Sequence, residues 1–232
     1  NITATTDETI LVNGQITVTL GTSDPVVLTA ATTGKTLTGS YAPSAGDTSA
    51  DLSISSFTLG SGTNVLEDIF GNDATSTSIP SGRNLSDNAN IVIDTTIPTA
   101  TISSAKYNND ASGAGVLVIT GTNFDTIFNA SGGPTSAADI KSYLDWSKLS
   151  WDIDGDSSTT DVSFVETDIA SSIVTNAQTL TVTLTDTAKS NLEATANFGA
   201  AGSADKIDVS AGFVRDTAGN AATTDAKADA GL

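Results

Sequence analysis

The chain has 232 residues, enough for one large domain or two of ordinary size. Acidic residues outnumber basic ones 27 to 9, and the net charge of -18 repels nucleic-acid phosphates and anionic lipid while attracting cations. Cys, His and Met are absent, which excludes disulfides, thiolate or imidazole metal sites and Ser-His or Cys-His catalytic pairs. We therefore expect no enzyme, no nucleic-acid partner and no membrane insertion. Because Met is absent, we also expect a processed form or a fragment.

Short strand-like segments come first in chain order and recur throughout. Residues 15–20, 50–54 and 179–184 alternate polar and apolar side chains, and residues 90–94 are predicted to form another strand. Clusters of Gly, Asn, Asp and Ser separate them, as turns require. The pattern predicts a mostly β protein built from antiparallel sandwiches.

Two segments have a helical pattern instead. Residues 135–144 follow Pro134, and Ile140, Tyr143 and Leu144 fall on one helical face. A second, weaker helix is expected over residues 186–192. We interpret both as short additions to a β framework.

A domain boundary is expected near Pro98, which follows the strand-like residues 90–94. The residue before a proline is pushed into extended geometry, so the connection should be short and stiff. We place the first domain at residues 1–94, the linker at 95–98 and the second domain at 99–232.

The two predicted domains share a short motif late in each one. Residues 68–72 and 216–220 both match Asp-x-x-Gly-Asn, and each motif precedes a final segment. Similar motifs at equivalent positions indicate related domains in tandem. Chance recurrence in a chain rich in Gly, Asn and Asp is the alternative.

Taken together, these segments resemble the Ig-like tandem repeats of large bacterial adhesins and S-layer-like surface proteins. The first domain carries the resemblance in residues 15–20, 41–52, 68–72 and the closing IVIDTTIPT, whose IDTTIP is similar to the DTTAP linker of such repeats. The second carries it in VLVITGTNF, DWSKLSW, LTDTAKSNL and RDTAGNAA. The resemblance implies two tandem Ig-like antiparallel β-sandwich domains, the second with short helical insertions. It also implies an extracellular, cell-surface location and calcium within or between modules.

The sharpest candidate for a metal site is the acidic segment Asp152, Asp154 and Asp156, which Asp161 could complete. Alternate carboxylates on a turning backbone supply the oxygen-rich shell that calcium needs. The spacing differs from an EF-hand, because the glycine comes one position early and Ser163 stands where a bidentate Glu is required. An acidic hairpin turn is the alternative.

Further candidate cation sites involve the repeated motif. Asp216 and Asn220 could share a calcium ion with the linker residue Asp94. At the other domain's N-terminal end, the candidate ligands are Asp7, Glu8, Asp68, Asn72 and Asp73. Tight turns in which Gly or Asn adopts positive φ are the alternative.

Trp146 and Trp151 are the only tryptophans, and they could be exposed to stack on a sugar or buried in the core. We predict a structural module of an extracellular surface assembly, such as an S-layer, an adhesin stalk or a filament subunit. Its partners would be neighbouring copies or repeats, and calcium would stiffen it. The alternative is a carbohydrate-binding surface domain that uses the two tryptophans to contact glycans. A glycosidase with a carboxylate pair is a third hypothesis.

Overall fold

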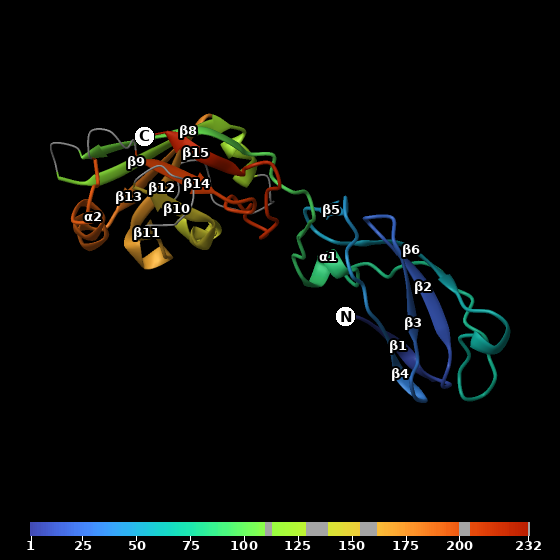
Figure 1. Cartoon of the computed structure of the whole chain (residues 1–232). Coiled ribbons are helices and arrows are strands. Elements are labelled where there is room, and N and C mark those ends of the chain that lie inside the picture. Colours follow the sequence, from blue (N-terminus) through green and yellow to red (C-terminus); the bar gives the residue numbers. More distant parts are fainter. Residues whose placement is uncertain (110–112, 129–138, 154–161, 200–204, 232) are drawn as a thin grey trace. The chain divides into compact units, whose positions relative to one another are not determined.

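The structure, a computed structural model, describes residues 1–109, 113–128, 139–153, 162–199 and 205–231 (Figure 1). It confirms the mostly β prediction, and all sheets within the described residues are antiparallel. The chain divides into two compact units, Asn1–Thr96 and Ile97–Leu232. The division falls between residues 96 and 97, within the segment predicted as a linker.

Unit 1 is built around a five-stranded sheet with the strand order β1-β4-β3-β2-β6 (Figure 1). The strands are β1 (Ile2–Ile10), β2 (Gln15–Leu20), β3 (Pro25–Thr29), β4 (Gly34–Gly39) and β6 (Ile54–Leu59). A second, two-stranded sheet pairs β5 (Thr48–Ser49) with β7 (Ile93–Asp94). The remaining elements are a 3-10 turn (Gly62–Asn64) and the short helix α1 (Leu85–Asn88).

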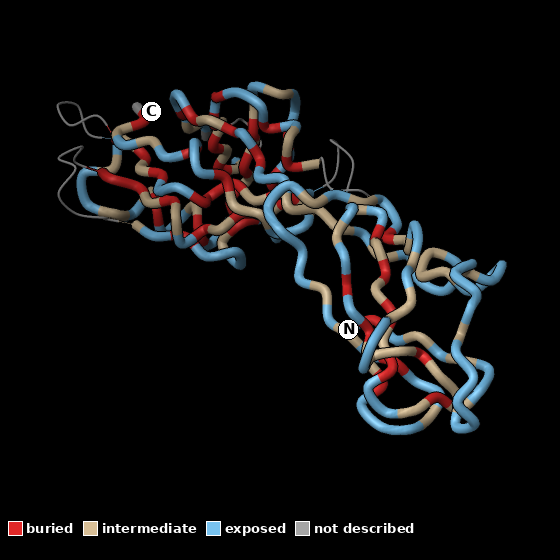
Figure 2. Tube along the Cα trace, turned by 90° about the vertical axis from the view of Figure 1, so that its right-hand side faces the viewer, coloured by how far each residue is buried: buried red, intermediate tan, exposed pale blue. Residues whose placement is uncertain are grey.

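The core of unit 1 lies on one face of this sheet. In β2, the inward side chains Ile16, Val18 and Leu20 are buried and alternate with partly exposed polar residues. Buried and more exposed positions follow one another along the strands in the same way (Figure 2). Leu52 and Leu66, which lie outside the sheet, are buried in the same cluster, so loops cover this face.

Unit 2 contains two four-stranded sheets, with the orders β12-β13-β9-β8 and β11-β10-β14-β15. The strands are β8 (Thr101–Asn109), β9 (Gly115–Thr122), β10 (Leu149–Asp152), β11 (Val162–Ser163), β12 (Ile169–Asn176), β13 (Thr179–Leu184), β14 (Lys206–Val209) and β15 (Lys227–Gly231). Leu117 and Val182 from the first sheet and Trp151 and Ile207 from the second belong to one hydrophobic cluster. The two sheets therefore share a single core.

Helical segments decorate unit 2. Thr185 caps the N-terminus of the helix α2 (Asp186–Glu193), because its hydroxyl accepts the N–H of Ala188, and the helix buries Leu192. The described 3-10 segments are Phe124–Phe128, Lys141–Tyr143, Trp146–Lys148 and Glu166–Asp168.

Several predicted elements coincide with observed ones. Residues 15–20 and 179–184 are β2 and β13, and the predicted helix 186–192 lies within α2. For the predicted helix 135–144, residues 135–138 lie outside the described residues, and the described part contains only the 3-10 turn Lys141–Tyr143.

Two predicted strands differ from the structure. The strand predicted at 50–54 is wrong, because residues 50–53 separate β5 from β6. The side chain of Leu52 is buried in the core of unit 1 from a segment outside the sheet, and its backbone N–H donates to the carbonyl of Ile91. The strand predicted at 90–94 is shorter than expected and comprises only Ile93–Asp94.

Candidate functional site

The Asp-x-x-Gly-Asn motif of unit 2 forms a closed turn. Asp216 Oδ1 accepts the backbone N–H groups of Ala218 (2.9 Å) and Asn220 (2.8 Å), and Oδ2 accepts the Asn220 side-chain amide (2.8 Å). The N–H of Asp216 donates to the carbonyl of Asn220 (3.0 Å), and the N–H of Gly219 donates to the carbonyl of Asp216 (3.0 Å). Gly219 has a φ of 94°, which glycine adopts without steric cost.

The motif of unit 1 repeats the same five hydrogen bonds. Asp68 accepts the N–H groups of Phe70 (2.7 Å) and Asn72 (2.9 Å) and the Asn72 side-chain amide (2.8 Å). The two backbone bonds measure 3.0 Å and 3.2 Å, and Gly71 has a φ of 84°. The Asn72 side chain and N–H lower the pKa of Asp68 below its ordinary value, because both bonds favour the ionised carboxylate. Both motifs therefore form tight turns, and the cation sites predicted at them stay predictions.

Hydrogen bonds outside the motif show where each turn lies within its own unit. In unit 2, the N–H of Thr217 donates to the carbonyl of Ile127 (3.1 Å), and the Thr126 hydroxyl accepts the N–H of Thr99 (3.2 Å). The Asp216 turn therefore lies at the end where the chain enters unit 2.

In unit 1, Asp68 forms an isolated bridge with Ile10, and the carbonyl of Glu67 accepts the N–H of Leu11 (3.0 Å). Asp7 and Glu8 come shortly before Ile10 in β1. Within the part of the chain that the structure describes, no three acidic side chains are grouped so that they could hold a metal ion. The predicted set of Asp94, Asp216 and Asn220 joins residues of different units and stays a prediction.

The acidic segment of unit 2 is described only at its first member. Asp152 is the last residue of β10, and it is 1% exposed. Asp154, Asp156 and Asp161 lie outside the described residues. The calcium site predicted there stays a prediction, with one ligand placed at a strand end.

Both tryptophans lie in the core of unit 2. Trp146 is 4% exposed, donates its Nε1–H to the carbonyl of Lys141 (2.8 Å) and packs edge-on against Phe213. Trp151 is 1% exposed and donates its Nε1–H to Asp205 Oδ2 (3.0 Å). The core interpretation is confirmed, and neither ring offers the exposed face that sugar stacking requires.

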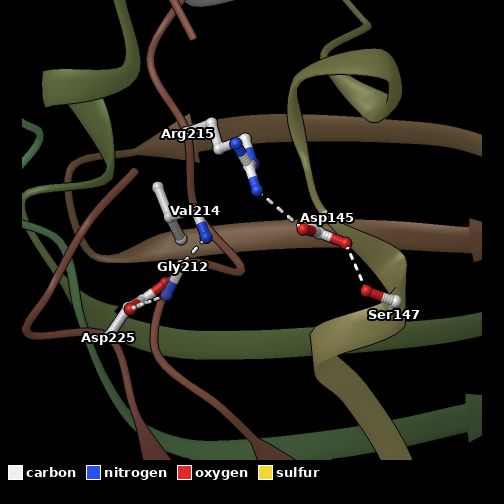
Figure 3. Close-up of polar contacts among 6 residues, drawn as sticks. All are labelled: Asp145, Ser147, Gly212, Val214, Arg215 and Asp225. Atoms are coloured by element: carbon white, nitrogen blue, oxygen red, sulfur yellow. Dashed lines mark hydrogen bonds and ion pairs between the residues drawn. The ribbon is translucent and has the colours of Figure 1, made fainter. Parts of the chain in front are cut away.

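Three carboxylates that carry no recognisable motif also hold the loops of unit 2. Besides Asp205, they include Asp225, which is fully buried and accepts the N–H groups of Gly212 (2.9 Å) and Val214 (2.7 Å) (Figure 3). The third is Asp145, which accepts the Ser147 hydroxyl (2.6 Å) and the guanidinium of Arg215 (2.7 Å).

The pKa of Asp145 is lowered, first by the hydrogen bond from Ser147 and then by Arg215. Sequence reasoning missed Asp145, Asp205 and Asp225, because isolated aspartates have no spacing that distinguishes them from other acidic residues. Their positions beside buried backbone N–H groups or distant side chains emerge only from the fold.

A further polar cluster surrounds Tyr41 in unit 1. Its hydroxyl lies 2.8 Å from Asp47 Oδ2, 3.2 Å from Asp24 Oδ2 and 3.1 Å from Thr22 Oγ1. Desolvation raises the pKa of Tyr41 to about 12, and both carboxylates contribute to the rise. The phenol therefore stays protonated at neutral pH and joins loops 22–24 and 41–47.

The chain matches no protein-family model, no curated protein and no solved structure. Among the described helices, none is long and apolar enough to cross a membrane.

Proposed function

We propose that the chain is a non-catalytic structural module of an extracellular surface assembly, made of two Ig-like β-sandwich domains in tandem. The observation that carries the proposal is the repeated turn. Five hydrogen bonds of matching donors and acceptors recur at Asp68 and Asp216, each turn in its own unit. Repetition of one local structure in successive, mostly β units is typical of a tandem array of related modules.

The chemistry of the polar residues supports a structural role. The buried aspartates Asp216 and Asp225 accept backbone N–H groups, so their carboxylates hold loops in place. Asp205 orients the indole of Trp151 in the core. A sequence without His or Cys lacks the side chains that most often activate a nucleophile.

Calcium binding at Asp152, Asp154, Asp156 and Asp161 is part of the proposal. Asp152 supports it, because β10 places a carboxylate that is 1% exposed immediately before the acidic segment. Oxygen ligands at alternate positions suit calcium, and the bound cation would offset the repulsion among neighbouring carboxylates. The bound ion would link the acidic residues to the end of β10.

The position of the protein on the source cells tests the proposed function directly. Antibodies raised against the purified chain should label intact cells of the source organism, and brief protease treatment of those cells should remove the label. Cells opened before labelling provide the control for total protein. Label that requires opened cells and survives protease treatment of intact cells would refute a surface assembly.

Calorimetry tests the calcium component. Titration of calcium into the wild-type chain should show a binding event that Asp154→Ala removes. Asp125→Ala provides a matched control, because it removes an exposed acidic charge from a described 3-10 segment of the same unit. Equal isotherms for the wild type and both variants would exclude calcium from the acidic segment.

A further inference from the structure

The outer face of the five-stranded sheet in unit 1 has an unusual composition. Its positions follow from the pairing: Thr17 lies opposite Val27 and Thr58, and Thr38 lies opposite Thr3 and Thr29. All are exposed or half-buried, while the alternate positions face the core. We call this surface the threonine face, and it comprises Thr3, Thr5, Gln15, Thr17, Thr19, Pro25, Val27, Thr29, Thr36, Thr38, Ser56 and Thr58.

The threonine face carries no charge in a chain whose net charge is -18. None of the side chains of the threonine face is Asp, Glu, Lys or Arg, and the exposed Asp7, which continues the alternation of Thr3 and Thr5, lies beyond this face on the edge strand β1. Like-charged copies repel each other wherever their acidic surfaces meet. An uncharged face is therefore the surface on which two copies can approach at the lowest electrostatic cost.

The chemistry of threonine also makes this face self-complementary. Each hydroxyl both donates and accepts a hydrogen bond, and each methyl group offers a small apolar contact. A face of such groups needs no partner of opposite character. It can meet an identical face across a two-fold axis, as contacts between identical subunits require.

The size of the threonine face sets the expected strength of the contact. Five strands spaced about 4.8 Å apart, with outward residues about 6.8 Å apart along each strand, span roughly 20 Å in each direction. Two such faces would bury on the order of 800–1,000 Å² together, below the usual range of stable complexes. The contact is therefore weak between free chains and gains strength where many copies are held side by side.

We infer that the threonine face is the surface through which two copies of this chain contact each other laterally. The inference rests on the proposed assembly role and names the partner surface within it. Unit 2 offers a useful contrast, because the outer face of its β12-β13-β9-β8 sheet includes Lys106, which lies opposite Val118. Two such faces would bring lysines into the contact area.

Self-association of the purified full chain tests this inference. Nitrogen-15 spectra recorded at rising concentration, up to about 1 mM, should show shifts that map to the threonine face. Sedimentation should show association that strengthens when salt is raised from about 0.05 M to about 0.5 M, because screening reduces repulsion between the acidic copies.

Variants locate the contact. Thr17→Glu, in the middle of β2, should weaken association at least about tenfold, because a two-fold contact would then bury two like charges, one from each copy. Thr17→Val keeps the face uncharged and should retain association. Thr181→Glu places the same charge on the outer face of β13 in unit 2 and should leave association unchanged. Melting curves show whether each variant folds.

Several outcomes would overturn the inference. The chain could stay monomeric at every salt concentration, or the NMR shifts could map to residues outside the threonine face. Thr17→Glu and Thr181→Glu could also weaken association equally. Co-sedimentation with insoluble cellulose or chitin that Thr17→Glu abolishes, in a chain that stays monomeric, would assign the face to a glycan instead. Surface labelling of cells is measured independently, so failure here leaves the proposed function standing.

Discussion

The turns at Asp68 and Asp216 have the same hydrogen bonds but different surroundings. Asp216 is 1% exposed, and the turn residue Thr217 donates its N–H to a neighbouring 3-10 segment. The unit 1 turn lies at the surface, and Phe70 at its tip is 83% exposed. The comparison shows that Asp, Gly and Asn fix the conformation locally, whereas the surroundings determine how much the turn contributes to stability.

The same difference extends to the two units. Among the described residues, the four buried aspartates (Asp152, Asp205, Asp216 and Asp225) all belong to unit 2. Unit 1, which is described in full, buries no charged side chain. Unit 2 therefore relies on buried carboxylates to organise its loops, and its stability should be more sensitive to the loss of a single aspartate.

Among the substitutions in the two turns, the largest expected effect on stability is that of Asp216→Ala. The substitution leaves two backbone N–H groups and an amide without their acceptor, and we expect a loss of roughly 2–4 kcal/mol from the stability of unit 2. Both tryptophans lie in unit 2, so tryptophan fluorescence during urea unfolding reports on this unit alone.

Asp68→Ala is the matched variant in unit 1. It removes the same hydrogen bonds at an exposed site, where water can replace the carboxylate. Its effect on unit 1, followed by hydrogen exchange of β2 amides, should be smaller. Equal losses of stability from Asp68→Ala and Asp216→Ala would show that burial of the aspartate does not change how much its turn contributes to stability.

Replacing either turn glycine by alanine should lower stability by an intermediate amount, and the loss should be the same in both units. Gly71 and Gly219 both have positive φ, and a Cβ built at either position meets no atom within 4 Å. The cost is therefore conformational, about 1–2 kcal/mol for each substitution. Hydrogen exchange measured in both units would reveal any difference, and a clearly larger cost at Gly219 would mean that packing also restricts that position.

Much of the local structure could be predicted from the sequence. The strands β2 and β13 follow strict alternation of polar and apolar residues, and the turn motif contains its own donors and acceptors. These features depend on neighbours within a few residues. The prediction failed at residues 50–53, where Leu52 alternates like a strand residue but pairs with Ile91, distant in the sequence.

The candidate sites were harder to predict for the same reason. Trp151 and Asp205 contact each other across 54 positions, so nothing near either residue indicates the contact. Asp225 accepts N–H groups more than ten residues away. Long-range pairing decides which acidic residues become buried, and residue spacing along the chain does not encode it.

The lowered pKa values of Asp145 in unit 2 and Asp68 in unit 1 have different causes, and acid titration should distinguish them. The pKa of Asp145 lies below 3.8 because Ser147 and Arg215 stabilise the carboxylate, so its stabilisation is complete above 3.8 and is lost as pH falls through the lowered pKa. We expect Arg215→Met to remove at most about 1 kcal/mol of this stabilisation. The pKa of Asp145 should rise toward 3.8, as NMR titration would show.

The pKa of Asp68 should respond to its own turn instead. Asn72→Ala removes the amide that contributes most to the lowered value, so the Asp68 pKa should rise. High salt should raise the Asp145 pKa more than that of Asp68, because Asp145 is paired with Arg215 whereas the pKa of Asp68 is lowered by uncharged hydrogen-bond donors. Equal salt dependence would contradict the assigned causes.

The smallest expected effect is that of Phe70→Ser. The ring is 83% exposed, so its removal forfeits little buried apolar area, and we expect a change in stability within about 0.5 kcal/mol. The backbone N–H of Phe70 still donates to Asp68, so the turn and the lowered Asp68 pKa should survive. Phe213→Ser, at a fully buried position of unit 2, should instead cost roughly 3–5 kcal/mol. A large loss of unit 1 stability with Phe70→Ser would mean that the ring packs against the unit, and the contrast between an exposed and an enclosed turn would fail.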